Sequence, residues 1–272
     1  MEKKNRIIAL VDFSNDTSAL IRFSSVFSEL IAGKVLFIHQ IPGMSPALSD
    51  NASKNKIIDF EVNEALSNLK VLTREHFQKE AQHSVIHNSL LSELELLKNN
   101  EYFDWVLVGL KKPNALKKFL MGSTTIKLVD YSEVMTVAIP FNDAVFLPER
   151  LVVAVSEKYP LNNVQFSVLI KNLSGRIKEE HFITILTEND NKDNATQYLN
   201  KVSEQYKGPN NTITCFKGDN LYEDLKNYVD GKSGSFLVVQ QGSRSLTDKV
   251  FRKFLINDLV YNGSNPIIIL SK

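Results

Sequence analysis

RIIALVD, residues 6–12, is an apolar run that ends in an acid, and the chain repeats its pattern as RLVVAV at residues 150–155. Short runs that are apolar at nearly every position are typical of strands buried on both faces of a parallel sheet. Each run is followed by an amphipathic helix and then by another apolar run. The two stretches therefore predict two starts of the same α/β plan.

The first plan extends to about residue 140. We expect helices after each strand, at 16–32, 57–79, 92–99 and 122–130, and we expect strands at residues 6–12, 34–41, 83–88, 104–109 and 135–140. Gly33 is the predicted stop of the first helix. This alternation predicts a parallel, right-handed, doubly wound sheet.

The plan restarts after a linker at residues 141–149. Further strands are expected at 179–189, 211–216, 235–241 and 265–272, with a helix near 246–261. An internal repeat of this length indicates duplication, and duplicated domains tend to pack as an intramolecular pseudo-dimer. We therefore expect two tandem α/β domains, residues 1–142 and 150–272, each with a five-stranded parallel sheet, which pack through their fifth strands or adjacent helices.

Composition excludes several classes of partner. Lys plus Arg total 32 and Asp plus Glu total 31, so no overall field would attract nucleic acid or acidic lipid. The early apolar run from Ile7 to Val11 is too short for a signal peptide, and no run approaches a membrane span. A single cysteine, Cys215, fits a reducing compartment. We expect a soluble, cytoplasmic protein.

One basic segment, VGLKKPNALKKFLMGSTTIKLV at residues 108–129, joins the predicted fourth strand to the next helix. It contains lysines and two glycines but no acid. Backbone N–H groups at a helix N-terminus such as Gly122-Ser123-Thr124 bind phosphate well, and glycine allows close approach of the anion. In doubly wound sheets ligands bind at the carboxyl ends of the strands, where Asp12 and Gly109 are expected.

In these features the chain resembles tandem members of the universal stress protein family. The resemblance rests on the strand order, on Asp12 after the first strand, on His39 near the end of the second, and on this basic segment. Nucleotide-binding members carry G-x2-G-x9-G-[ST]; here the frame reads Gly109, Lys112 and Gly122-Ser123. The resemblance implies two flavodoxin-like (adenine nucleotide alpha hydrolase-like) domains with strand order 3-2-1-4-5 and helices on both faces.

The resemblance also implies a ligand and a role. ATP or another adenine nucleotide, with Mg²⁺ as an accompanying ion, would act as a regulatory ligand of a stress-response protein that is not an efficient enzyme. Asp12 would contact the adenosine end. The phosphates would be held by Gly109, Lys112, Gly122, Ser123 and Thr124.

Lys112 departs from the motif, and two interpretations stay open. If the position needs a positive φ, lysine costs on the order of 1 kcal/mol and its side chain blocks the phosphates. Alternatively, its ammonium group replaces the lost backbone contact with a point charge. In the second copy, alignment places other residues at all five marked positions: Ser156, Gln240, Ser243, Lys253 and Phe254. We therefore expect a degenerate second domain, against a lesser alternative in which Gly242, Ser243 and Arg244 hold an anion.

A rival hypothesis is an interaction protein without nucleotide that acts through dimer surfaces, and further dimerisation of the tandem chain stays open. No Walker loop or G-x-S-x-G motif is present, so no catalytic residue is predicted. Slow ATP hydrolysis stays open as a lesser alternative, for which the sequence shows no identifiable water-activating base. His83 and His87 flank a strand without an acidic cluster, so no metal site is predicted. His39 is expected to form a hydrogen bond at a strand end.

Overall fold

The computed structural model describes residues 3–14, 17–41, 50–110, 128, 133–140, 145, 147–186, 190–217, 227–229, 234–241 and 265–272. The chain divides into two compact units, Met1–Gly109 and Leu110–Lys272, called the first and second units below. Within the described residues, no helix combines the length and the apolar character that a membrane crossing requires.

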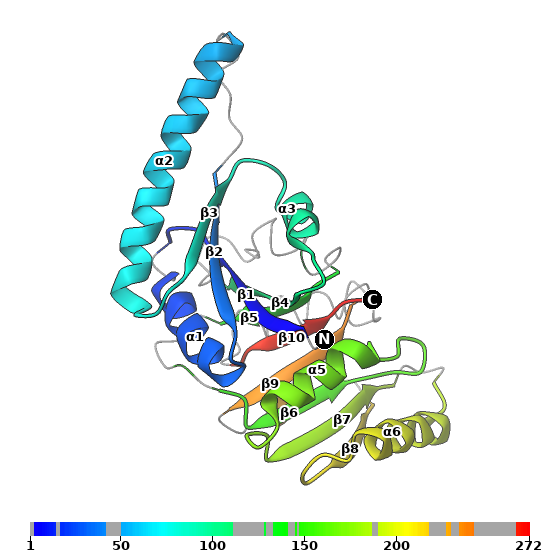
Figure 1. Ribbon diagram of the computed structural model, residues 1–272. Coiled ribbons are helices and arrows are strands. Elements are labelled where there is room, and N and C mark those ends of the chain that lie inside the picture. The colour runs from blue at the N-terminus through cyan, green and yellow to red at the C-terminus, as the bar shows by residue number, and fades with distance from the viewer. Residues whose placement is uncertain are drawn as a thin grey trace. The chain divides into compact units, whose positions relative to one another are not determined.

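The first unit is a four-stranded parallel sheet with three helices (Figure 1). Its strands are paired in the order β3-β2-β1-β4. The elements are β1 (Lys4–Val11), α1 (Thr17–Leu30), β2 (Lys34–Gln40), α2 (Asn51–His76), β3 (Gln82–Ile86), α3 (Leu90–Leu97) and β4 (Tyr102–Gly109).

The core of this unit forms where α1 packs against the central strands. Ile7 and Ala9 of β1 are fully buried, as expected for an apolar run inside a sheet. Phe27 of α1 is also fully buried and meets Trp105 of β4 edge-on, with ring centroids 5.5 Å apart. This arrangement fixes α1 against the sheet.

The amino end of β1 is held by a buried ion pair. Arg6 Nε lies 2.6 Å from Asp104 Oδ1, and Arg6 Nη2 lies 2.9 Å from Asp104 Oδ2. The guanidinium also donates to the Leu97 carbonyl at 2.8 Å and lies over the Tyr102 ring. Because both charges are paired and hydrogen-bonded, the free-energy cost of burying them is offset.

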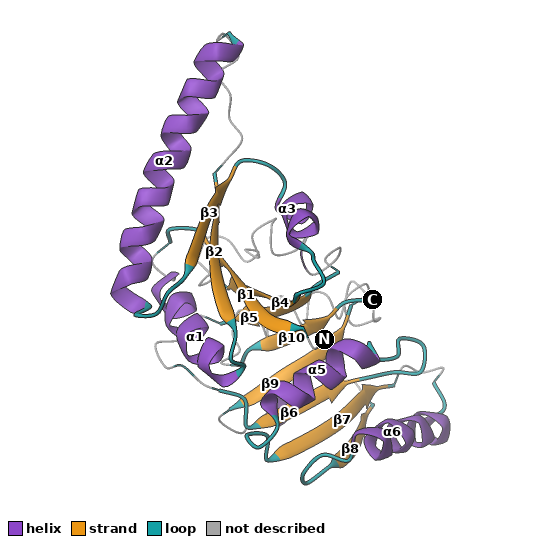
Figure 2. Ribbon diagram, in the orientation of Figure 1, coloured by secondary structure: helices purple, strands orange, loops and turns teal. Residues whose placement is uncertain are grey.

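The second unit has six strands and two described helices (Figure 2). Its strands are paired in the order β5-β10-β9-β6-β7-β8. The elements are β5 (Met135–Ile139), β6 (Arg150–Ala154), α5 (Asn163–Leu173), β7 (Glu179–Ile185), α6 (Lys192–Tyr206), β8 (Thr212–Phe216), β9 (Ser235–Gln240) and β10 (Ile267–Leu270).

The α/β class with a mainly parallel sheet is confirmed, but the expectation of two separate five-stranded parallel sheets is wrong. The sheet of the second unit has six strands, and in it β5 pairs antiparallel with β10, with Val137 opposite Ile268. Val137 and Ile268 are both fully buried. An apolar edge strand exposes unpaired backbone groups, and pairing two such edges covers both. The order β8-β7-β6-β9-β10 follows the predicted 3-2-1-4-5.

Candidate site at the carboxyl ends of β1 and β4

Asp12 follows β1 directly and organises the turn into α1. Its Oδ1 accepts hydrogen bonds from the Ser14 backbone N–H at 3.1 Å, from Ser14 Oγ at 2.6 Å and from Thr17 Oγ1 at 3.1 Å. Thr17 is the first residue of α1. Asp12 therefore fixes the loop at the end of β1 as well as bringing a carboxylate to this edge.

Phe13 occupies a backbone conformation that is unusual for a bulky residue. Its φ is +56°, in the left-handed region. Its ring, 38% exposed, lies against His39 with ring centroids 4.0 Å apart. His39 Nδ1 lies 2.7 Å from the Val11 carbonyl oxygen; since a carbonyl only accepts, Nδ1 carries the proton. The predicted strand-end hydrogen bond of His39 is thereby confirmed.

Gly109 ends β4 beside the end of β1. The two strands are parallel with Leu10 opposite Val108, so Gly109 and Asp12 belong to the same edge of the sheet. A Cβ at Gly109 would have Leu20 Cβ at 4.0 Å as its nearest neighbour, and its φ lies outside the left-handed region. Local packing therefore does not require glycine here, and the space above its Cα is open within the described residues.

The other predicted ligands, Lys112, Gly122, Ser123 and Thr124, lie outside the described residues. Their roles stay predictions from the sequence. Phe13 was missed by sequence reasoning because its role depends on a positive φ and on contact with a histidine 26 positions away, which no local pattern indicates.

The corresponding edge of the second unit is filled by amide side chains. Gln240, aligned with Gly109, is 4% exposed. Its Oε1 accepts from the Asn162 N–H at 2.7 Å, and its Nε2 donates to the Ser271 carbonyl at 2.7 Å. Gln165 Nε2 donates to Ser271 Oγ at 2.6 Å, and Gln165 Oε1 accepts from the Ser271 N–H at 2.8 Å.

This amide cluster also caps the helix that begins here. Asn162 Oδ1 accepts from the Gln165 N–H at 3.0 Å at the start of α5. One N–H group of this N-terminus is thus already bonded by a side chain, which makes the N-terminus a poorer anion site. At the position aligned with Asp12, Ser156 forms a tight turn with Tyr159, whose N–H donates to the Ser156 carbonyl at 3.1 Å.

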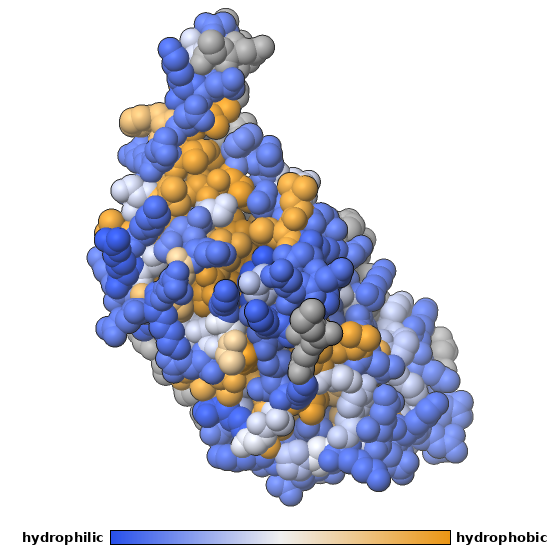
Figure 3. All heavy atoms as spheres, viewed as in Figure 1, coloured by the Kyte–Doolittle hydropathy of each residue, from blue (hydrophilic) through white to orange (hydrophobic). Residues whose placement is uncertain are grey.

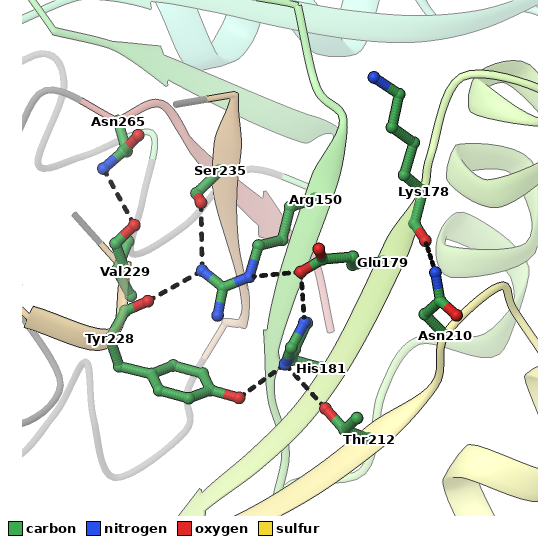
Figure 4. A network of polar contacts seen from close by, with 10 residues as sticks. All are labelled: Arg150, Lys178, Glu179, His181, Asn210, Thr212, Tyr228, Val229, Ser235 and Asn265. Atoms are coloured by element: carbon green, nitrogen blue, oxygen red, sulfur yellow. Dashed lines mark hydrogen bonds and ion pairs between the residues drawn. The ribbon is translucent and has the colours of Figure 1, made fainter. Parts of the chain in front are cut away.

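A second polar network, which sequence reasoning missed, joins the amino ends of four strands, β6, β7, β8 and β9 (Figure 4). His181 Nε2 lies 3.0 Å from Glu179 Oε2, while His181 Nδ1 lies 2.6 Å from the Tyr228 hydroxyl and 2.7 Å from the Thr212 hydroxyl. Glu179 also pairs with Arg150, whose Nε is 3.4 Å from Glu179 Oε2.

The network continues from the buried guanidinium of Arg150. It donates to the Tyr228 carbonyl at 2.8 Å and to Ser235 Oγ at 3.1 Å, and it lies over the Tyr228 ring. A histidine between a carboxylate and a hydroxyl can serve proton transfer, but the Arg150 side chain is only 6% exposed and each bond named here joins neighbouring segments of the sheet. We assign the network to holding the strand ends together.

No group of three His, Cys, Asp or Glu side chains that could hold a metal ion occurs in the described part of the chain. The pKa of His83 is lowered by burial and by nearby Lys70 and Arg74, which favours the neutral ring. Its Nε2 lies 2.7 Å from Thr73 Oγ1.

Comparison with known proteins identifies similar folds but does not assign the chain to a family. No family model matches the sequence, and no curated protein matches it either. The fold is similar to the crystal structure of a universal stress protein from Archaeoglobus fulgidus DSM 4304, with 16% identity, 99% of both chains covered and a TM-score of 0.68.

Two further solved structures are similar over nearly the whole chain. A putative universal stress protein from Pseudomonas aeruginosa UCBPP-PA14 has 11% identity and a TM-score of 0.57, covering 98% of this chain and 93% of that one. The cytoplasmic domain of a prokaryotic cation chloride cotransporter has 11% identity and a TM-score of 0.53, covering 98% and 95%. The same fold is thus found in proteins with different roles, so function has to be argued from the site.

Proposed function

We propose that this chain is a universal-stress-protein-like protein of the stress response, and that it binds an adenine nucleotide, ATP or a relative, as a regulatory ligand at the carboxyl ends of β1 and β4. The observation that carries the proposal is the position of Asp12 and Gly109 at the ends of neighbouring parallel strands, where Leu20 Cβ, at 4.0 Å, is the nearest described atom to a Cβ placed at Gly109. Ligands of doubly wound sheets bind at such an edge.

The aromatic side chains beside Asp12 support the same ligand. Phe13 presents a partly exposed ring that lies against His39 at an interplanar angle of 35°. Aromatic rings stack with planar bases and gain about 1–3 kcal/mol per base in nucleic-acid complexes. The resemblance to universal stress proteins places Asp12 at the adenosine end of the nucleotide. There its carboxylate would accept hydrogen bonds from the adenosine hydroxyl groups. The phosphates would be held by Lys112, Gly122, Ser123 and Thr124, and nucleotide occupancy would shift a conformational or partner equilibrium.

The asymmetry between the two copies limits the proposal to one nucleotide per chain. Gln240 fills the position that Gly109 leaves open, and its amide is bonded to Asn162 and Ser271. A nucleotide at that edge would have to break these buried bonds without replacing them, which is costly. We therefore assign binding to the first copy alone.

Isothermal titration with Mg²⁺-ATP tests the proposal. Titration of the wild-type protein should give a heat signal that fits binding at one site. Gly109→Val should abolish this signal, because its side chain would occupy the space that the nucleotide needs. Glu101→Val is the matched control, because it adds the same side chain at an exposed position just before the opposite end of β4. Absence of binding by the wild type at millimolar ATP would remove the proposal.

An interaction protein without nucleotide is the second candidate. Its support is α2, along which hydrophobic side chains gather on the surface (Figure 3). Phe60 is 68% and Val71 is 56% exposed on this helix. Mass spectrometry of gently denatured, purified protein discriminates between the candidates, because a co-purifying adenine nucleotide contradicts a scaffold without ligand.

A further inference from the structure

Glu180 places a carboxyl group in the interior of the protein. It lies near the start of β7 and is only 1% exposed. Its Oε2 is buried without a hydrogen-bond partner among the described residues. An ionised carboxylate in such a position is costly, whereas a neutral carboxyl group costs much less.

The carboxyl group lies against the turn that connects α6 to β8. A Cβ at Gly208 would overlap the Glu180 carboxyl group, so only glycine leaves room for it in this conformation. The Glu180 N–H donates to the Pro209 carbonyl oxygen at 3.2 Å. Glu180 therefore touches the turn through both its side chain and its backbone.

The turn itself consists of residues 207–211 and contains two left-handed residues. Lys207 caps α6 with φ +37°, and its N–H donates to the Ser203 carbonyl at 3.0 Å; Asn210 has φ +45°. Asn211 has its own Oδ1 buried without a partner among the described residues. The orphan atoms of Glu180 and Asn211 are both acceptors, and a proton on Glu180 would supply a donor.

Among the described residues, no cation lowers the pKa of the Glu180 carboxyl group. Successive side chains of a strand point to opposite faces, so Glu179 and His181 lie on the other face. The charged and titratable groups on the adjoining described elements are Arg150 of β6, Lys192, Asp193, Tyr198, Lys201, Glu204 and Tyr206 of α6, Cys215 of β8, and Arg176, Lys178 and Lys207 of the connecting segments. Burial is the cause that raises the pKa of Glu180 to about 7, without a contribution from any of them.

We propose that Glu180 and the 207–211 turn form a pH-sensitive element: the turn is closed while the buried carboxyl group is protonated, and it opens when that group ionises. The folded conformation binds a proton that the opened one releases. The opening constant should therefore rise with pH, by up to about tenfold per pH unit between the ordinary carboxyl pKa and about 7, and then level off.

Hydrogen exchange of the wild-type chain between pH 5 and pH 8 tests the proposal. After correction for the intrinsic rate, protection of the Glu180 and Lys207 amides should fall as the pH rises toward 7. Glu180→Gln keeps the shape but cannot ionise, so its protection should not change with pH. Glu149→Gln is the matched control, because Glu149 is a glutamate at the surface whose pKa is lowered by its hydrogen bond to Lys178.

A second measurement keeps the test decisive if Glu180→Gln does not fold. In wild-type protein labelled with ¹³C at the glutamate side-chain carboxyl, one signal should titrate near pH 7. A set of glutamate signals that all titrate below pH 5.5 overturns the proposal. Protection that depends equally on pH in wild type and Glu180→Gln overturns it as well.

Discussion

The side-chain amide of Gln240 donates a hydrogen bond to the Ser271 carbonyl oxygen at 2.7 Å, and its oxygen accepts from the Asn162 N–H at the same distance. These bonds tie the end of β9 to the end of β10 and to the start of α5. The edge that ligands use in a doubly wound sheet is here part of the interior. Gly109, at the aligned position of the first copy, has no side chain that could do this.

Gln240→Ala should destabilise the protein by about 1–3 kcal/mol, because it leaves the Asn162 N–H without its partner and removes one of the two hydrogen bonds to the Ser271 carbonyl oxygen. Urea unfolding measures this loss. Gln40→Ala is the matched control: Gln40 ends β2 and donates to the Asn88 carbonyl at 2.7 Å, but it is exposed. Water can replace that bond, so the control should change stability much less. Equal losses would contradict the structural role of Gln240.

Asp104→Asn should cost about 3–5 kcal/mol in the free energy of unfolding, because removing one partner leaves the charge of Arg6 buried and uncompensated. Both side chains of this pair are less than 10% exposed. The exposed pair Lys98–Glu95 is the control, and Glu95→Gln should cost no more than about 1 kcal/mol. A loss below that of the control would show that the pair does not hold β1 to β4.

The sequence predicted the strands well because apolar runs such as Ile7–Val11 report burial on both faces. It also identified Asp12 and Gly109 at strand ends, since strand ends follow from the runs. It offered contact between the two fifth strands, which are β5 and β10, as one of two alternatives, but it did not indicate that they pair edge to edge and antiparallel, because periodicity defines a strand but not which edge it pairs with.

The sequence also did not predict which side chains far apart along the chain would form hydrogen bonds or ion pairs. Alignment placed Gln240 opposite Gly109, but its bonds reach residues 78 and 31 positions away. Likewise, Arg6 and Arg150 occupy equivalent positions of equivalent strands, yet Arg6 pairs with Asp104 on β4 while Arg150 pairs with Glu179 on β7. Ser235 stands opposite Arg150 in register, where Asp104 stands opposite Arg6. Such exchanges of partner depend on tertiary contacts.

Phe13→Gly and Phe13→Ala should separate backbone strain from ring stacking. Both variants lose the contact with His39, but only glycine adopts a φ of +56° without steric cost. Phe13→Gly should therefore be more stable than Phe13→Ala by about 1 kcal/mol in thermal or urea unfolding. Both should bind adenine nucleotide more weakly than wild type under the proposed function. An alanine variant as stable as the glycine variant would contradict the strained conformation.

His83 should make the protein less stable as the pH falls below its ordinary pKa of 6.5. Burial, Lys70 and Arg74 lower its pKa in the folded state, so the unfolded state binds the proton more readily and acid favours unfolding. His83→Gln should reduce the loss of stability between pH 7 and pH 5, measured by urea unfolding. His87→Gln, an exposed histidine one residue after β3, should retain the wild-type loss.

The His83 measurement is best made in the Glu180→Gln background. The raised pKa of Glu180 acts in the opposite direction, because its stabilising proton is lost as the pH rises toward about 7. In wild type the two effects partly cancel between pH 5 and pH 7, so a flat stability profile there does not exclude either one. Once Glu180 cannot ionise, the acid-induced loss should become steeper, and adding His83→Gln should flatten it. A profile that stays unchanged through both substitutions would rule out both residues as the source of the pH dependence.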